Sequence, residues 1–89
     1  MEQIKEVWIA DDDKSIRWML EKAMKKDGLK VRLFSDADQL IVALKVGNPD
    51  LVLSDIRMPG TEGLDLLAHL KEEKPSTPVI IMTAYADLE

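Results

Sequence analysis

The chain has 89 residues, of which 46% are hydrophobic and 33% are charged, and its formal net charge is −5. This length and composition fit one globular domain. The acidic charge argues against direct nucleic-acid binding by this segment, because such binders normally carry clustered Lys and Arg. Cysteine is absent, which excludes disulfides and thiolate zinc sites, and the apolar runs are too short to span a membrane. We therefore expect a cytoplasmic protein without membrane association.

The first predicted unit is a strand followed by a helix. The apolar run 6-EVWIA-10 indicates the strand, Asp13 is placed to cap the helix, and Gly28 is placed to end it. Arg17 follows the acidic run and could lie near its carboxylates, although a surface ion pair is the favoured interpretation. Trp18 is predicted to be half-buried or part of a partner surface. The apolar stripe of this helix has helical spacing and consists of Ile16, Met19, Leu20, Ala23 and Met24.

The same alternation continues to the end of the chain. The strand 30-KVRLF-34 precedes a helix with Ser35 as its N-cap, which ends at 47-GNP-49. A third strand, 51-LVLSD-55, leads into a loop rich in Pro and Gly and then a third helix. The fourth strand is predicted at 79-VIIMT-83, and residues 84–89 are predicted to start a fourth helix.

Alternating strands and helices predict a flavodoxin-like α/β fold with a parallel sheet and helices on both faces. The expected strand order is 2-1-3-4. Compared with the complete fold, the chain lacks the usual fifth βα unit. The fourth strand is therefore expected at an exposed edge, where pairing with another chain is favoured.

Acidic residues gather at the predicted strand ends. Asp11 and Asp12 follow the first strand, Asp55 ends the third, and Thr83 ends the fourth. Each aspartate alone would be read as a helix cap or a turn residue, but the strand order brings these ends into one crevice. Three adjacent carboxylates cannot all stay ionised without a cation. Hard oxygen ligands without His or Cys favour Mg²⁺.

Three motifs, 10-ADDD-13, 54-SDIRMPGTEG-63 and 79-VIIMTAY-85, resemble the receiver domain of two-component response regulators. The resemblance covers essentially residues 1–89, as a partial receiver domain. The stretches SIRW and VIIMTAYADL are similar to the nitrogen-regulatory, enhancer-binding type. In that family the domain is a phosphoprotein that receives a phosphoryl group from a sensor histidine kinase. It controls transcription in the parent protein.

The resemblance assigns roles to individual positions. It implies that Asp55 is the phosphoacceptor and that Thr83 contacts the phosphoryl group and moves on activation. It implies Mg²⁺ bound directly by Asp12, together with Asp55 and the backbone carbonyl of Arg57, and with Asp11 as an outer or water-mediated ligand. The domain is then not an enzyme in its own right, beyond self-catalysed phosphotransfer and dephosphorylation.

Two alternatives stay open. The family's fifth strand supplies a lysine that pairs with the phosphoryl group, and this sequence ends before it. The chain is then a signalling-incompetent fragment that folds as a homodimer or a domain-swapped oligomer through the fourth strand. A third interpretation is a flavodoxin-like module for a small phosphate ligand, although the Gly-rich phosphate loop expected there is missing.

Overall fold

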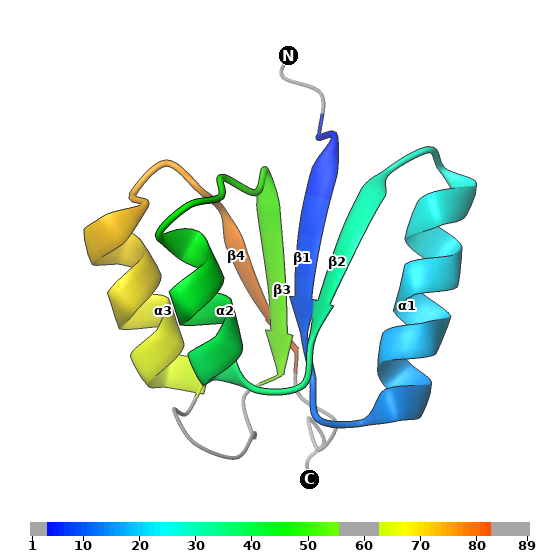
Figure 1. The fold of residues 1–89 in the computed structure, drawn as a ribbon, viewed down its shortest axis with the longest axis horizontal. Helices are drawn as coiled ribbons and strands as arrows, with labels where there is room; N and C mark the ends of the chain where they lie inside the picture. The colour runs from blue at the N-terminus through cyan, green and yellow to red at the C-terminus, as the bar shows by residue number, and fades with distance from the viewer. Residues whose placement is uncertain (1–3, 56–62, 83–89) are drawn as a thin grey trace, which may run out of the picture.

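The fold is a parallel four-stranded sheet with the order β2-β1-β3-β4, as predicted. The computed structural model describes residues 4–55 and 63–82. The fourth strand was predicted at residues 79–83, and the structure describes it over Val79–Met82. Thr83 and residues 84–89 lie outside the described part. All four strands point the same way, so their carboxyl ends share one edge of the sheet (Figure 1). The strands are β1 (Glu6–Ala10), β2 (Lys30–Phe34), β3 (Leu51–Asp55) and β4 (Val79–Met82).

Helices cover both faces of the sheet, which is the predicted doubly wound arrangement. One face carries α1, and the other carries α2 and α3 (Figure 1). In the described residues no helix is long and apolar enough to cross a membrane. The helices are α1 (Lys14–Lys26), α2 (Ala37–Leu44) and α3 (Gly63–Glu73).

The alternation of side chains along β1 divides the core into two layers. Val7 and Ile9 belong to the layer under α1, while Trp8 and Ala10 belong to the layer under α2 and α3. All four are buried, because β1 is a central strand with helices on both sides. The layer under α2 and α3 also contains Phe34, Ala37, Leu40, Ala43, Leu44, Val52, Leu66 and Leu70.

Helix α1 is capped as predicted but is less buried than its apolar stripe suggests. Asp13 accepts hydrogen bonds from the N–H groups of Ser15 and Ile16, and Gly28 follows the helix with φ of 82°. Leu20 and Met24 pack against the sheet, whereas α1 has no fully buried residue. Trp18 is 61% exposed, so the prediction that it is half-buried was wrong. Within the described residues α1 stands alone on its face, without a second helix to cover its sides.

The cap of α2 differs from the predicted one by a single residue. Asp36, not Ser35, is the N-cap, and its Oδ1 accepts from the N–H of Gln39 at 2.8 Å. The Gln39 side chain returns a hydrogen bond to Asp36 Oδ2 at 3.2 Å. Asp36 and Gln39 occupy the N-cap and N3 positions of a capping box, one residue after the predicted pair, but the Gln39 amide donates to the N-cap carboxylate. Ser and Asp are both strong caps, so the local sequence did not separate them.

Asp50 connects the N-terminal ends of β1 and β3. Its Oδ2 accepts hydrogen bonds from the N–H groups of Lys5 at 3.0 Å and Glu6 at 2.9 Å. The bonds from Glu6 and Lys5 hold the pKa of Asp50 below its ordinary 3.8. The N–H of Asp50 in turn donates to the Glu6 carbonyl at 2.9 Å. These contacts hold β3 in register beside β1.

Trp8 is enclosed by a close approach of the chain at Gly47. The indole is 1% exposed, and its Nε1 donates to Glu6 Oε2 at 2.8 Å. A Cβ atom added to Gly47 would lie 2.7 Å from the Trp8 atoms Cη2 and Cζ2. Gly47 was predicted to end α2, and the structure shows that it also leaves room for the indole ring.

We expect Gly47→Ala to lower the free energy of unfolding by about 1–3 kcal/mol, because the new methyl group overpacks the indole. Chemical denaturation measures the loss. The control is the same substitution in a Trp8→Phe background, since Phe lacks the two ring atoms that approach Gly47. The penalty should shrink there, as a double-mutant cycle would report. An equal penalty in both backgrounds would contradict steric overpacking by the indole.

Candidate functional site

The acidic site forms where β1 and β3 end side by side. Ala10 is paired with Ser54 in the parallel register, so Asp11 and Asp55 emerge at the same level of the sheet edge. One carboxylate oxygen each from Asp11, Asp12 and Asp55 lies within 4.8 Å of the others. Asp11 is buried, Asp55 is half-buried and Asp12 is exposed. The structure thus brings together three of the predicted site residues. Arg57 and Thr83 lie outside the described residues.

The three adjacent aspartates of the β1–α1 loop have different structural roles. Asp13 Oδ1 accepts from the N–H of Ser15 at 2.8 Å and of Ile16 at 3.3 Å, which caps α1 as predicted. Asp11 Oδ1 accepts from the Asp13 N–H at 2.8 Å, and the Asp11 N–H donates to the Phe34 carbonyl at 3.1 Å. Asp11 is therefore an extension of the sheet, while Asp13 belongs to the helix.

The electrostatic environment of Asp11 disfavours its charged form. Burial raises its pKa above the ordinary 3.8, and the hydrogen bond from the Asp13 N–H opposes this in part. The negative charges of Asp55, Asp12 and Asp13 raise the pKa further. A divalent cation held between these oxygens would remove the repulsion. The donor set consists of carboxylate oxygens alone, which fits Mg²⁺ better than zinc or copper.

Arg17 makes a contact that sequence reasoning missed. Its Nη1 donates to the backbone carbonyl of Asp11 at 2.6 Å, so Arg17 lies beside the acidic loop, and its bond is to the main chain and not to a carboxylate. Arg17 lies on the first turns of α1, and its own N–H donates to the Asp13 carbonyl at 3.0 Å. Side chains of a helix lean toward its N-terminus. That rule was the signal by which the contact with the preceding loop could have been anticipated.

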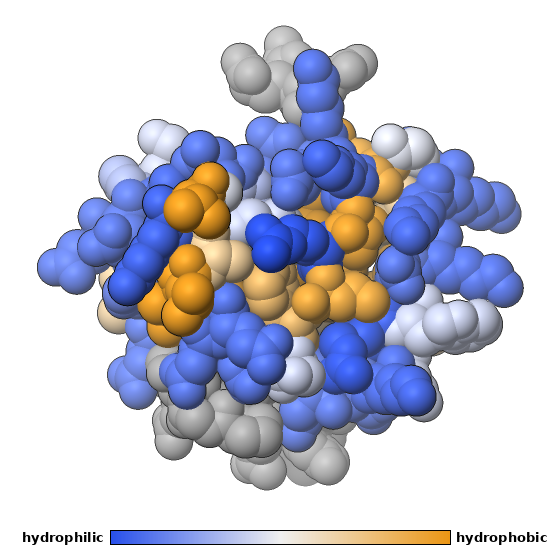
Figure 2. All heavy atoms as spheres, viewed as in Figure 1, coloured by the Kyte–Doolittle hydropathy of each residue, from blue (hydrophilic) through white to orange (hydrophobic). Residues whose placement is uncertain are grey.

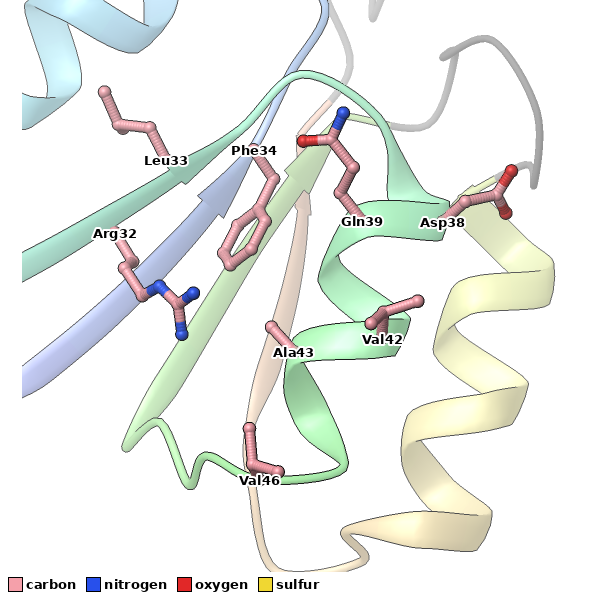
Figure 3. Close-up of a pocket in the computed structure, with 8 residues that line it drawn as sticks. All are labelled: Arg32, Leu33, Phe34, Asp38, Gln39, Val42, Ala43 and Val46. Carbon is pink, nitrogen blue, oxygen red and sulfur yellow. The ribbon is translucent and has the colours of Figure 1, made fainter.

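A separate groove of about 640 Å³ lies between β2 and α2 (Figure 3). Arg32 and Phe34 point into it from β2, whereas Leu33 points to the opposite side of the sheet. The Arg32 guanidinium lies over the rings of Trp8 at 5.2 Å and Phe34 at 5.3 Å, and so covers this part of the core. Apolar surface is also visible over α2 and between β2 and α1 (Figure 2). The groove contains none of the clustered carboxylates.

The model of the response regulator receiver domain family matches residues 7–89. The chain is 52% identical over 83 residues to the DNA-binding transcriptional regulator NtrC of Proteus hauseri, covering 93% of this chain and 18% of that protein. The chain therefore spans less than a fifth of the length of this curated relative.

Two solved structures share the fold. One is the response regulator protein TrrA of Thermotoga maritima in complex with Mg²⁺-BeF, with a TM-score of 0.88 and 29% identity, covering 93% of this chain and 72% of that one. The other contains TrrA in complex with the histidine kinase ThkA, with a TM-score of 0.87 and 28% identity, covering 97% and 74%. With its matching sequence, its strand order and its carboxylates at the ends of β1 and β3, the chain belongs to the response regulator receiver domain family.

Proposed function

We propose that this chain is a phosphoacceptor domain in which Asp55 receives a phosphoryl group from a histidine kinase with the help of Mg²⁺. The observation that carries the proposal is the meeting of Asp11, Asp12 and Asp55 within 4.8 Å at the carboxyl ends of two parallel strands. Ligands of open parallel sheets bind outside these ends, where the strand order reverses. The match to the receiver family supports the same assignment.

The proposed reaction uses Asp55 as the nucleophile. An oxygen of its carboxylate attacks the phosphorus of a phosphohistidine, so that an O–P bond forms while the P–N bond breaks. The imidazole leaves with the electron pair and takes up a proton, and the product is an aspartyl phosphate. Phosphoryl transfer asks a protein mainly for positioning and for stabilisation of charge. Asp55 is the last residue of β3, so its pairing in the sheet supplies its position.

Asp11, Asp12 and Asp55 would hold Mg²⁺ through their carboxylate oxygens, and the backbone carbonyl of Arg57 is a further proposed ligand. Bound there, Mg²⁺ neutralises negative charge on the transferring group. Thr83 is the proposed contact of the phosphoryl group and the residue that responds to it. The relative TrrA is in complex with Mg²⁺-BeF, which supports Mg²⁺ as the metal.

The proposed partner is a sensor histidine kinase, and the proposed role of the parent protein is control of transcription. The complex of TrrA with the kinase ThkA supports the first part. The similarity to NtrC, which is a DNA-binding transcriptional regulator, supports the second. Both statements rest on longer relatives, because the chain covers 18% of this NtrC and 74% of the chain in the ThkA complex.

The central test is chemical phosphorylation. Incubation with acetyl phosphate and Mg²⁺ should add one phosphoryl group to the chain, and Asp55→Asn should abolish it because the amide is not a nucleophile. Intact mass spectrometry measures the adduct, which should be labile to base. Asp13→Asn is the matched control, since Asn caps a helix about as well as Asp, and it should still be modified. A wild-type chain that takes up no phosphoryl group, or an adduct that survives in Asp55→Asn, would refute the assignment.

As the pH falls, Mg²⁺ binding should begin to weaken at a higher pH than it would if Asp11 had the pKa of an ordinary aspartate. Burial and the neighbouring carboxylates raise the pKa of Asp11 above 3.8, so protons compete with the metal as the pH falls toward that raised value. Below it, the affinity should fall by up to about tenfold per pH unit for each proton taken up. Isothermal titration calorimetry across the acidic range measures this. An affinity independent of pH down to 3.8 would argue against Asp11 as a ligand.

A second proposal concerns assembly, and a specific feature of β4 favours it. In the described part of the chain β4 is one of the two outer strands of the sheet, and its Ile80 is 50% exposed. Outer strands present unpaired backbone groups that favour pairing with another chain. We propose that the chain forms a homodimer or a domain-swapped oligomer through this strand.

Light scattering should then give about twice the 10.1 kDa mass of one chain. Ile80→Lys should shift the mass toward the monomer, because a charge on an outer strand disfavours pairing. Val46→Lys is the control, since Val46 is 88% exposed but lies away from β4. A monomeric wild-type chain at every concentration tested would rule out this assembly.

A further inference from the structure

The β1–α1 loop carries three adjacent carboxylates. The positively charged side chain of Arg17 donates a hydrogen bond to the backbone of this loop. Arg17 Nη1 donates to the carbonyl oxygen of Asp11 at 2.6 Å. Hydrogen bonds from a charged donor are among the stronger ones in proteins. Because the acceptor is a main-chain oxygen, this bond uses neither carboxylate oxygen of Asp11. The guanidinium therefore holds the loop without occupying the atoms that would bind a metal.

The bond also acts on Asp12. A peptide group is planar, so the carbonyl oxygen of Asp11 lies in one rigid unit with the N–H and Cα of Asp12. Fixing that oxygen fixes the point from which the Asp12 side chain starts. Asp11 itself is held by two further hydrogen bonds: its N–H donates to the Phe34 carbonyl, and its Oδ1 accepts from the Asp13 N–H. Asp11 is 5% exposed, so water competes weakly for these bonds.

We propose that Arg17 is a positioning residue for the Mg²⁺ site, and that it sets the directions of the Asp11 and Asp12 carboxylates through the Asp11 carbonyl. This inference rests on the proposed function, because it takes Asp11, Asp12 and Asp55 as the metal ligands. In this role Arg17 acts through the loop backbone, since its guanidinium donates to a main-chain oxygen. Groups that orient metal ligands typically change metal affinity strongly when they are removed.

Electrostatics alone predicts the opposite result. A positive charge near the site repels Mg²⁺, so removing it should strengthen metal binding. Positioning predicts that removing Arg17 weakens metal binding, because the carboxylates lose their fixed directions. Lys14 offers a matched comparison: it is an exposed cation at the start of the same helix, next to the same loop. The sign of the change therefore separates the two explanations.

The experiment measures the Mg²⁺ dissociation constant of the full chain by isothermal titration calorimetry. Arg17→Met should bind Mg²⁺ about tenfold more weakly than wild type. Lys14→Met should bind it as tightly as wild type or more tightly. Thermal denaturation without Mg²⁺ runs in parallel, because a purely structural role would lower the melting temperature and leave the dissociation constant of the folded protein unchanged. An unchanged or tighter constant in Arg17→Met overturns the proposal.

Arg17→Lys keeps the charge and provides the second variant if Arg17→Met does not fold. Its shorter reach and its single ammonium group should give Mg²⁺ binding weaker than wild type, and a constant equal to wild type overturns the proposal. Failure of the proposed function looks different. A wild-type chain that binds no Mg²⁺ overturns the metal site and this inference together, whereas wild-type binding with unchanged Arg17 variants overturns this inference alone.

Discussion

The parallel pairing of β1 with β3 is the constraint on which the rest of the structure depends. Ala10 lies opposite Ser54, so the next residue of each strand, Asp11 and Asp55, reaches the sheet edge at the same level. A shift of one residue would turn the side chains of one strand to the opposite face. The two core layers resist such a shift, because Val7 and Trp8 are buried on opposite sides of β1. Asp50 holds the other end of the pair through the N–H groups of Lys5 and Glu6.

This register places like charges together, which costs stability. The fold moderates the cost without removing it. Asp13 is turned away to cap α1, and the Arg17 guanidinium is bonded to the loop backbone. The raised pKa of Asp11 shows the repulsion and the burial that remain. Such local costs are expected where a site is built for a ligand, because sequences break the rules of stability mainly at functional positions.

The residues of the site could be found from the sequence because their positions follow from the ends of strands. Parallel strands bring their carboxyl ends to one edge, so a strand pattern and a strand order were enough to join Asp11 and Asp12 with Asp55. The contacts of Arg17 and Gly47 could not be found in this way. The Arg17 contact follows from the direction in which helix side chains lean, and the Gly47 contact from the distance between the Trp8 ring and a backbone segment far away in the sequence. The order and ends of the strands encode neither. The exposure of Trp18 likewise depends on how many helices share one face of the sheet.

The sequence by itself determined the alternation of strands and helices, the cap of α1 and the gathering of acids at strand ends. These features follow from local rules, namely the spacing of apolar residues, the chemistry of caps and the direction of parallel strands. Tertiary structure decided which of Ser35 and Asp36 caps α2, where the Arg17 guanidinium points and why position 47 is a glycine. The first two are choices between side-chain arrangements that local preferences leave open, since Ser and Asp are both strong caps. The third depends on a close contact between elements, because the interior is packed so densely that tenths of an ångström matter.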